Sequence, residues 1–193
     1  MTFAAKRAVI LDRDGTIVVD RDYLDDPDQL QFLPGALTGL RLLRERGHPI
    51  VVVTNQSGVG RGRFSLARLQ QIHARLLQMV RAGGAAIDAL YYCPHRPEDD
   101  CDCRKPKPLL LLQAAAELGF EPAAAVVIGD KSSDVQLGHN VGALTMLVSE
   151  TGRARDGTDT QADYVIHDLI EAARLLADPQ LATRPGRGAT PGR

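Results

Sequence analysis

Short apolar runs, mostly of β-branched residues, alternate along the chain with longer amphipathic stretches. Several runs are continuously apolar, which is typical of strands buried on both faces of a parallel sheet. The runs that predict strands cover residues 8–11, 50–53, 89–92, 125–128, 144–148 and 164–166. Their alternation with helical patterns favours one α/β domain, a doubly wound, Rossmann-like parallel sheet with helices on both faces.

Apolar residues repeat at three- and four-residue spacing between these strands, which predicts helices. The helical patterns cover residues 37–43, 66–80, 109–118 and 168–176. Ser65 is placed to cap the second helix at its N-terminus, and Gly119 is placed to end the third. Asp168 is placed to cap the last one.

Composition narrows the class of protein. The 193 residues are 44% hydrophobic and 24% charged, as expected for one globular domain. Proline and glycine crowd the chain after Asp178, so we expect a domain over residues 1–178 and a disordered tail over residues 179–193. The formal charge of −1 argues against a protein that neutralises a nucleic-acid backbone.

The chain also lacks the marks of a membrane or secreted protein. No apolar stretch approaches the roughly 18 residues of a membrane helix, and the first apolar run breaks at Asp12 and Asp14 rather than forming a signal peptide. Three cysteines make a disulfide framework improbable. We expect a soluble, cytoplasmic monomer with a small-molecule substrate and with no nucleic-acid or membrane partner.

Polar residues follow three of the predicted strands at the point where each strand ends. Asp12 and Asp14 follow the first, Thr54 ends the second, and Asp130 and Asp134 follow the fourth. Each residue alone is also a common helix cap. As a set they are expected to lie together at one edge of the sheet. Ligands of open α/β sheets bind at that edge, beyond the carboxyl ends of the strands.

Clustered carboxylates repel one another unless a cation joins them. An all-oxygen site with few protein ligands and room for water and phosphate suits Mg²⁺. Such a site can perform phosphoryl transfer, in which one aspartate attacks phosphorus and a second moves the proton. The metal and a lysine then offset charge on the phosphoryl oxygens.

All three cysteines lie in one loop, residues 93–103. Cys93, His95, Cys101 and Cys103 supply the four ligands of a closed tetrahedral zinc site. Free thiols or a redox pair are the alternatives, but free thiols are normally buried and these are interleaved with Pro, Arg and Asp. We expect zinc to fold a loop that has too few apolar residues to order itself.

The run DRDGT at residues 12–16 resembles the DxDGT signature of the haloacid dehalogenase superfamily of phosphohydrolases. The resemblance implies that Asp12 is the nucleophile, which becomes an aspartyl-phosphate, and that Asp14 is the general acid and then the base. Thr54 matches the hydroxyl that binds the transferring phosphoryl group, and Lys105 matches the lysine of the third motif.

The same resemblance extends to the run GDKSSD at residues 129–134. It implies that Asp130 binds Mg²⁺ together with Asp12 and Asp14, and that Asp134 is a supporting acid. The match covers nearly the whole predicted domain in the right order.

The cysteine loop leads directly into Arg104 and Lys105, and this arrangement narrows the resemblance. It is similar to a small branch without a cap domain that holds heptose bisphosphate phosphatases and histidinol-phosphate phosphatases. In that branch the zinc loop stands in for a cap and places the Arg-Lys pair over the substrate.

Residues 54–64 and the segment after the first motif resemble the heptose branch. The resemblance implies substrate contacts from Asp20, Tyr23, Asn55, Gln56, Ser57, Arg61, Arg63, Arg104 and Lys131. A doubly phosphorylated sugar needs extra cations of this kind, although Arg61 and Arg63 also suit a solvated surface. We therefore expect a heptose bisphosphate as the substrate.

Three alternatives stay open. One is a histidinol-phosphate phosphatase, because the short spacer between His95 and Cys101 is common in those enzymes. The sequence also departs from the branch at Pro108-Leu109, which replaces a Pro-Gly. A DNA 3′-phosphatase would need a basic groove. A non-enzymatic phosphosugar-binding protein would be expected to lose Asp12 or Asp14, and both are present.

Overall fold

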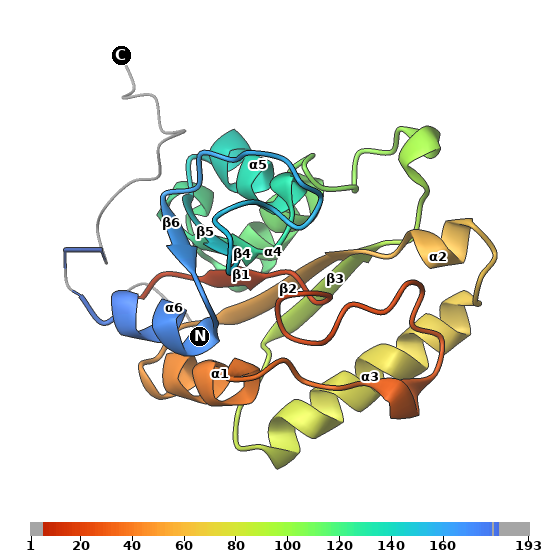
Figure 1. The fold of residues 1–193 in the computed structure, drawn as a ribbon, viewed down its shortest axis with the longest axis horizontal. Coiled ribbons are helices and arrows are strands. Elements are labelled where there is room, and N and C mark those ends of the chain that lie inside the picture. Colours follow the sequence, from red (N-terminus) through yellow and green to blue (C-terminus); the bar gives the residue numbers. More distant parts are fainter. Residues whose placement is uncertain (1–5, 179, 182–193) are drawn as a thin grey trace.

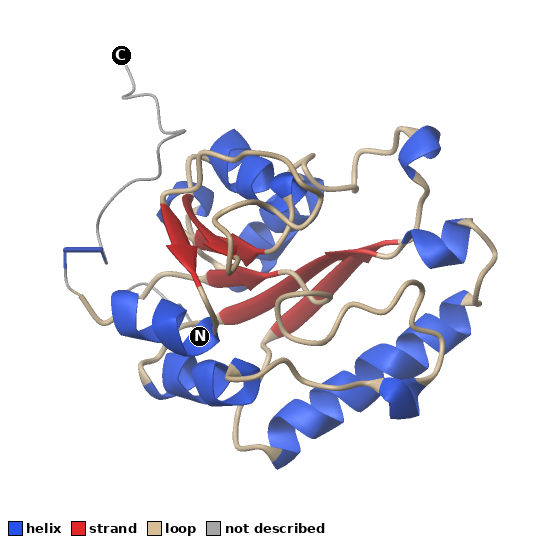
Figure 2. Cartoon of the chain, viewed as in Figure 1, coloured by secondary structure: helices blue, strands red, loops and turns tan. Residues whose placement is uncertain are grey.

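The computed structural model describes residues 6–178, 180 and 181, and they form a parallel sheet flanked by helices (Figures 1 and 2). The strands are β1 (Val9–Leu11), β2 (Ile50–Asn55), β3 (Ala89–Cys93), β4 (Val126–Gly129), β5 (Leu144–Val148) and β6 (Tyr164–Ile166). Their order is β3-β2-β1-β4-β5-β6, and every neighbouring pair is parallel. The predicted fold class and all six predicted strands are confirmed.

Helices cover both faces of the sheet, as Figure 1 shows. One face carries α1 (Ala36–Glu45), α3 (Leu66–Ala82) and α6 (Leu169–Leu175). The other face carries α4 (Leu109–Leu118) and α5 (Ser132–Val141). The short helix α2 (Ser57–Gly60) and the 3-10 turns η1 (Pro27–Gln29), η2 (Pro97–Asp99) and η3 (Pro122–Ala124) lie in the connections.

The expected helix ends are present. The Ser65 hydroxyl accepts a hydrogen bond from the backbone N–H of Arg68, and the Asp168 carboxylate accepts one from Glu171. Gly119 ends α4 with a φ of +71°, a conformation that favours glycine. The apolar spacing does not single out α5, because much of this helix is polar and its buried face is short.

Side chains of the central strands alternate between two apolar layers. Val9 and Leu11 of β1 pack with α1, α3 and α6, whereas Ile10 packs with α4 and α5. The three residues are at most 1% exposed, as expected for a strand covered on both faces. The two layers fix the sheet and therefore the loops at its carboxyl edge.

The end of the described chain is fastened to its beginning. Arg7, just before β1, donates from Nε to the carbonyl of Leu181 at 2.9 Å and from Nη1 to the carbonyl of Ala124 at 2.9 Å. Leu181 itself is buried. The rest of the predicted tail, residues 179 and 182–193, lies outside the described residues.

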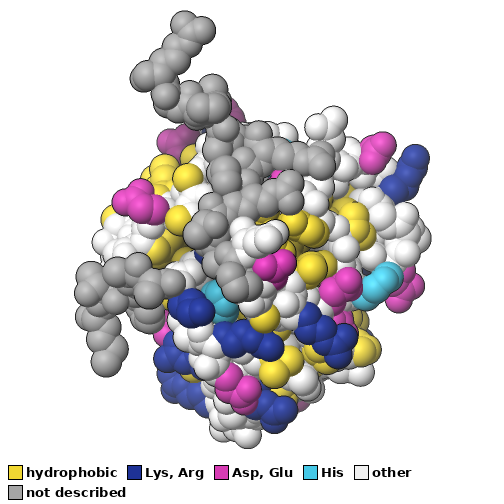
Figure 3. Space-filling model, turned by 90° about the vertical axis from the view of Figure 1, so that its left-hand side faces the viewer, with side chains coloured by type: hydrophobic (Ala, Val, Ile, Leu, Met, Phe, Trp, Pro, Cys, Tyr) yellow, Lys and Arg dark blue, Asp and Glu magenta, His cyan; other side chains and the backbone are white. Residues whose placement is uncertain are grey.

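The described surface carries charges of both signs. On the side of α1 and α6, Lys and Arg side chains gather on the lower half of the view in Figure 3, with Asp and Glu side chains among them. Within the described part of the chain, no helix combines the length and the apolar character needed to cross a bilayer.

Candidate active site

The loops after β1, β2 and β4 meet at the carboxyl edge of the sheet. Asp12 directly follows β1, and its backbone N–H donates to the carbonyl of Ile128 in β4 at 3.0 Å. Beside these loops lies a pocket of about 180 Å³. The predicted substrate contacts that line it are Asp20, Tyr23, Asn55, Gln56, Ser57 and Lys131. The structure thus brings the predicted segments together.

A buried ion cluster forms the floor of the site. The ammonium of Lys105 lies 2.8 Å from Oδ1 of Asp12 and 2.7 Å from Oδ1 of Asp134, and it donates to the carbonyl of Val53 at 2.7 Å. All three charged side chains are at most 6% exposed. Burial opposes ionisation of Asp12, but Lys105 outweighs it, so the pKa of Asp12 lies below its usual value.

Asp134 is held on both of its oxygens. Oδ1 pairs with Lys105, and Oδ2 accepts from the backbone N–H of Lys131 at 3.1 Å, at the start of α5. Asp134 therefore caps α5 and supports the lysine at once. The role of Asp134 as a supporting acid stays a prediction.

Asp130 stands out because neither of its carboxylate oxygens has a hydrogen-bond partner among the described residues. It is 3% exposed, and burial together with the charge of Asp12 raises the pKa of Asp130 to about 7. Oxygens of Asp12, Asp130 and Asp134 lie within 4.8 Å of one another. Three buried carboxylates against the one buried ammonium of Lys105 leave an excess of negative charge, which a divalent cation would offset.

The Asp14 carboxylate is held apart from this cluster. Arg13 donates to it from Nε at 3.0 and 3.1 Å and from Nη2 at 2.8 Å. Gln56 donates from Nε2 to Asp14 Oδ2 at 2.7 Å and to Thr54 Oγ1 at 2.9 Å. The amide of Gln56 therefore joins Asp14 to Thr54. Binding of a metal ion by the Asp14 carboxylate stays a prediction.

The side chain of Asn55 bonds to the backbone of Lys105. Its side-chain amide donates to the backbone carbonyl of Lys105 at 3.1 Å, and its Oδ1 accepts from the backbone N–H of Lys105 at 3.0 Å. These two bonds hold Lys105 beside the end of β2. Both polar atoms of the Asn55 side chain are engaged, although Asn55 also lines the pocket.

Two basic side chains lie beside Asp20, which lines the pocket. Lys131 lies 3.1 Å from Asp20, and Arg155 lies 3.6 Å from Asp20 and 3.9 Å from Asp130. Asp20 thus faces two cations. Tyr23, at a φ of +58°, lies under the guanidinium of Arg63 at 5.5 Å.

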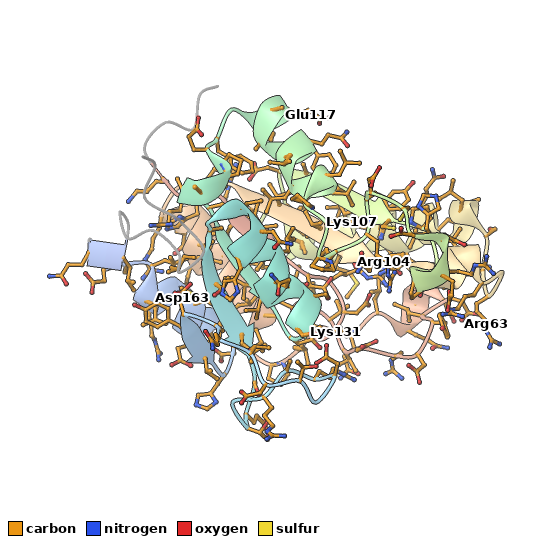
Figure 4. The ribbon with its side chains drawn as sticks, turned by 90° about the horizontal axis from the view of Figure 1, so that it is seen from above. Arg63, Arg104, Lys107, Glu117, Lys131 and Asp163 are labelled. Carbon is orange, nitrogen blue, oxygen red and sulfur yellow. The ribbon has the colours of Figure 1, made fainter. Side chains whose placement is uncertain are left out.

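Three basic residues predicted to contact the substrate, Arg61, Arg63 and Arg104, lie outside the lining of this pocket. Arg61 pairs with Glu98 at 3.1 Å, and Arg104 donates to the carbonyl of His95 at 3.3 Å. Figure 4 shows Arg63 at the far edge of the molecule, whereas Arg104 and Lys131 lie nearer its middle. Neither Arg61, Arg63 nor Arg104 is among the residues that line the 180 Å³ pocket.

The four predicted zinc ligands lie together. Cys101 Sγ is 3.4 Å from Cys93 Sγ and 3.5 Å from Cys103 Sγ, and His95 Nδ1 is 3.7 and 3.2 Å from Cys93 and Cys103. Tetrahedral zinc, with Zn–S of about 2.3 Å and Zn–N of about 2.0 Å, separates its ligand atoms by about 3.5 to 3.8 Å. The donor set and its spacing therefore fit zinc, with His95 binding through Nδ1.

The cysteine loop is fastened to the edge of the pocket. The backbone N–H of Gln56 donates to the carbonyl of Cys93 at 2.7 Å, and that of Gly60 donates to the carbonyl of Pro94 at 2.9 Å. The ion pair of Arg61 with Glu98 adds a side-chain link. The position of α2 consequently depends on the conformation of this loop.

Sequence reasoning missed two residues of the site. Arg13 lies between the two aspartates of DRDGT. A cation between two carboxylates in the sequence could have indicated that Arg13 pairs with one of them. Arg155 lies in the loop after β5, and its distance from Asp20 depends on how that loop folds, so the sequence carried no signal for it.

Comparisons with known proteins agree with this geometry. Residues 102–172 match the model of the HAD-hydrolase-like family. The chain is 38% identical to a D-glycero-beta-D-manno-heptose-1,7-bisphosphate 7-phosphatase of Pasteurella multocida, over 89% of this chain and 97% of that protein. It is 34% identical to the phosphatase of the same name from Escherichia coli K12, over 90% and 95% of the two chains.

Solved structures give the same picture. The crystal structure of a D,D-heptose 1,7-bisphosphate phosphatase from B. bronchiseptica, complexed with magnesium and phosphate, matches with a TM-score of 0.81 and 32% identity. The match covers 89% of this chain and 98% of the other. A phosphatase of the same description from Burkholderia thailandensis matches with a TM-score of 0.67 and 30% identity, over 89% and 99% of the two chains.

Proposed function

Because the chain belongs to the heptose-1,7-bisphosphate 7-phosphatase family of HAD-like hydrolases, we propose that it hydrolyses the 7-phosphate of D-glycero-D-manno-heptose 1,7-bisphosphate. One observation carries the chemistry. Asp12 is buried, ionised beside Lys105, and close to Asp130, whose oxygens accept no hydrogen bond from the described residues. An ionised carboxylate at that place is suited to attack phosphorus.

In the first step of the proposed reaction, an oxygen of Asp12 bonds to phosphorus while the bond from phosphorus to the sugar oxygen breaks. Asp14 donates a proton to the departing oxygen. Thr54 accepts a hydrogen bond from Gln56, which leaves its own hydroxyl hydrogen for an oxygen of the transferring group. Lys105 holds Asp12 in place and offsets negative charge.

In the second step, the oxygen of a water molecule bonds to phosphorus, and the bond from phosphorus to Asp12 breaks. The Asp14 carboxylate takes a proton from that water, so inorganic phosphate leaves and Asp12 is restored. One residue thus serves as acid and then as base.

The residues at the carboxyl edge suit Mg²⁺. Asp12 and Asp130 would hold it, whereas the Asp14 carboxylate, predicted as a third ligand, is held away from them by Arg13 and Gln56. The unpartnered oxygens of Asp130 and the excess negative charge of the cluster support the assignment. When bound, Mg²⁺ supplies charge stabilisation for the phosphoryl oxygens.

We also propose that Cys93, His95, Cys101 and Cys103 hold one zinc ion. Four protein ligands leave no open position, so the ion is structural. Its part is to order the loop that carries Arg104 and Lys105 and that contacts Gln56 and Gly60. Zinc thiolates persist in a reducing compartment, which supports action in the cytoplasm.

Substrate recognition is proposed to use the pocket and the cations around it. Lys131 and Ser57 line the pocket, whereas Arg61 and Arg63 follow α2 and Arg104 follows the cysteine loop, outside the residues that line it. For a second phosphate to use Lys131, it would compete with Asp20. We propose that the chain acts as a monomer on this small substrate, without nucleic-acid or membrane partners.

The test of the substrate is a comparison of kcat/KM for heptose 1,7-bisphosphate and for histidinol phosphate. Charge-assisted contacts contribute about 1.5–3 kcal/mol each, so one differential contact favours the bisphosphate about tenfold or more. Arg61→Ala should reduce that preference. A preference for histidinol phosphate, or equal efficiencies, would contradict the proposed substrate.

A further inference from the structure

Arg13 is among the largest fully buried side chains of the described chain, at 1% exposure. A guanidinium taken out of water is destabilising unless it is paired and hydrogen-bonded. Here the pairing partner is the neighbouring residue, Asp14, which Arg13 contacts with both Nε and Nη2. Nη2 also donates to Gln56 Oε1 at 3.0 Å. Arg13, Asp14 and Gln56 therefore form a closed triangle of hydrogen bonds.

Within this triangle, the two carboxylate oxygens of Asp14 accept different numbers of hydrogen bonds. Oδ2 accepts from Arg13 Nε at 3.1 Å, from Arg13 Nη2 at 2.8 Å and from Gln56 Nε2 at 2.7 Å. Among the described residues, Oδ1 accepts only from Arg13 Nε, at 3.0 Å. A carboxylate oxygen has about two acceptor positions. Oδ2 is therefore saturated, and Oδ1 keeps a free position beside the pocket that Asp14 lines.

We infer that Arg13 and Gln56 are positioning residues: they hold the Asp14 carboxylate so that Oδ1 is the oxygen that transfers the proton. The inference rests on the proposed phosphatase reaction, in which Asp14 gives a proton to the sugar oxygen and takes one from water. The planar fork of arginine fixes the orientation of the carboxylate, whereas an ammonium would allow it to rotate.

The two steps of the reaction respond differently to a misplaced Asp14. An aryl oxygen leaves without much help from an acid, so p-nitrophenyl phosphate forms the aspartyl-phosphate even when proton donation is poor. The second step needs Asp14 as a base for every substrate. A variant with a loosened Asp14 should therefore form the covalent intermediate quickly and hydrolyse it slowly.

The experiment is rapid mixing of Arg13→Lys with p-nitrophenyl phosphate and Mg²⁺, with nitrophenol followed by absorbance. We expect a burst of about one nitrophenol per chain and then a steady rate about tenfold or more below wild type. KM for heptose 1,7-bisphosphate should change much less than kcat. Gln56→Leu should show the same pattern more weakly, and Arg68→Lys, on the exposed side of α3, should match wild type.

Two results would overturn the inference. One is an Arg13→Lys variant with the kcat of wild type. The other is a burst amplitude that falls in the same proportion as kcat, since that would mean fewer folded chains rather than a slower second step. If wild type itself hydrolyses neither substrate, the proposed function fails, whereas an active wild type with either of the two results refutes the positioning role alone.

Discussion

At the scale of single residues, the site depends on the small size of Gly15. The backbone there has a φ of +81°, and a Cβ would overlap the carboxylate of Asp130. Gly15→Ala should therefore displace Asp130 and weaken Mg²⁺ binding. We expect activity at saturating substrate to fall by about tenfold or more and the Mg²⁺ concentration for half-maximal activity to rise, as measured by a Mg²⁺ titration.

Gly119→Ala is the matched control. Gly119 has a φ of +71°, but open space surrounds the position of its Cβ. Both variants should lose about 1 kcal/mol of folding stability through backbone strain. Only Gly15→Ala should change the Mg²⁺ requirement, and an equal change in both variants would contradict the close packing of Gly15 on Asp130.

At the scale of single residues, the sequence predicts which charged side chains share the site but not which partners the amide side chains bind. The sequence places Asp12 at the site because it follows a strand, and it places Lys105 there through its match to the lysine of the third motif. Asn55 and Gln56 are amides that can bond to almost any polar group. Their actual partners, the backbone of Lys105 and the carboxylate of Asp14, depend on rotamers that only packing decides.

At the scale of elements, the cysteine loop holds α2 against the pocket. Cys101→Ser removes one thiolate from the proposed zinc site while leaving the sheet untouched. We expect the zinc content after dialysis to fall well below one per chain and KM for the heptose bisphosphate to rise about tenfold. The melting temperature should move by less than about 5 °C, because Cys101 is only partly buried against the apolar layer to which Cys93 belongs.

Asp102→Asn provides the control in the same loop. The Asp102 side chain is exposed and lies 3.6 Å from Lys107 at the surface. Its zinc content and KM should equal those of wild type. A Cys101→Ser protein that retains one zinc per chain, or that keeps the wild-type KM, would show that the loop does not act as described.

Elements differ in how well the sequence predicts them. The strands β1, β2, β4 and β5 are predictable because both of their faces are buried, so nearly every residue is apolar. Helix α5 is not singled out by apolar spacing, since its N-terminal end serves the site. Asp134 enters the ion cluster, and Lys131, at the N-cap, pairs with Asp20. The loop after β5 brings Arg155 to Asp20, and no periodic pattern predicts that approach.

At the scale of the whole molecule, the sheet gathers residues from four distant segments. The strand order places β1 between β2 and β4, so Asp12, Thr54 and Asp130 lie at the carboxyl ends of neighbouring strands. Lys105 reaches the same point from the loop after β3. Parallel topology makes this convergence predictable, whereas the hydrogen bonds within the site follow from side-chain packing.

The central claim is that Asp12 carries the phosphoryl group during Mg²⁺-dependent hydrolysis of the heptose bisphosphate. The most direct measurement is the mass of the protein, acid-quenched early in turnover, followed by peptide mapping. The account predicts a phosphate on the peptide that contains Asp12 in wild type, and neither phosphate nor turnover in a folded Asp12→Asn variant. Turnover by pure Asp12→Asn, or a phosphate on another residue, would contradict it.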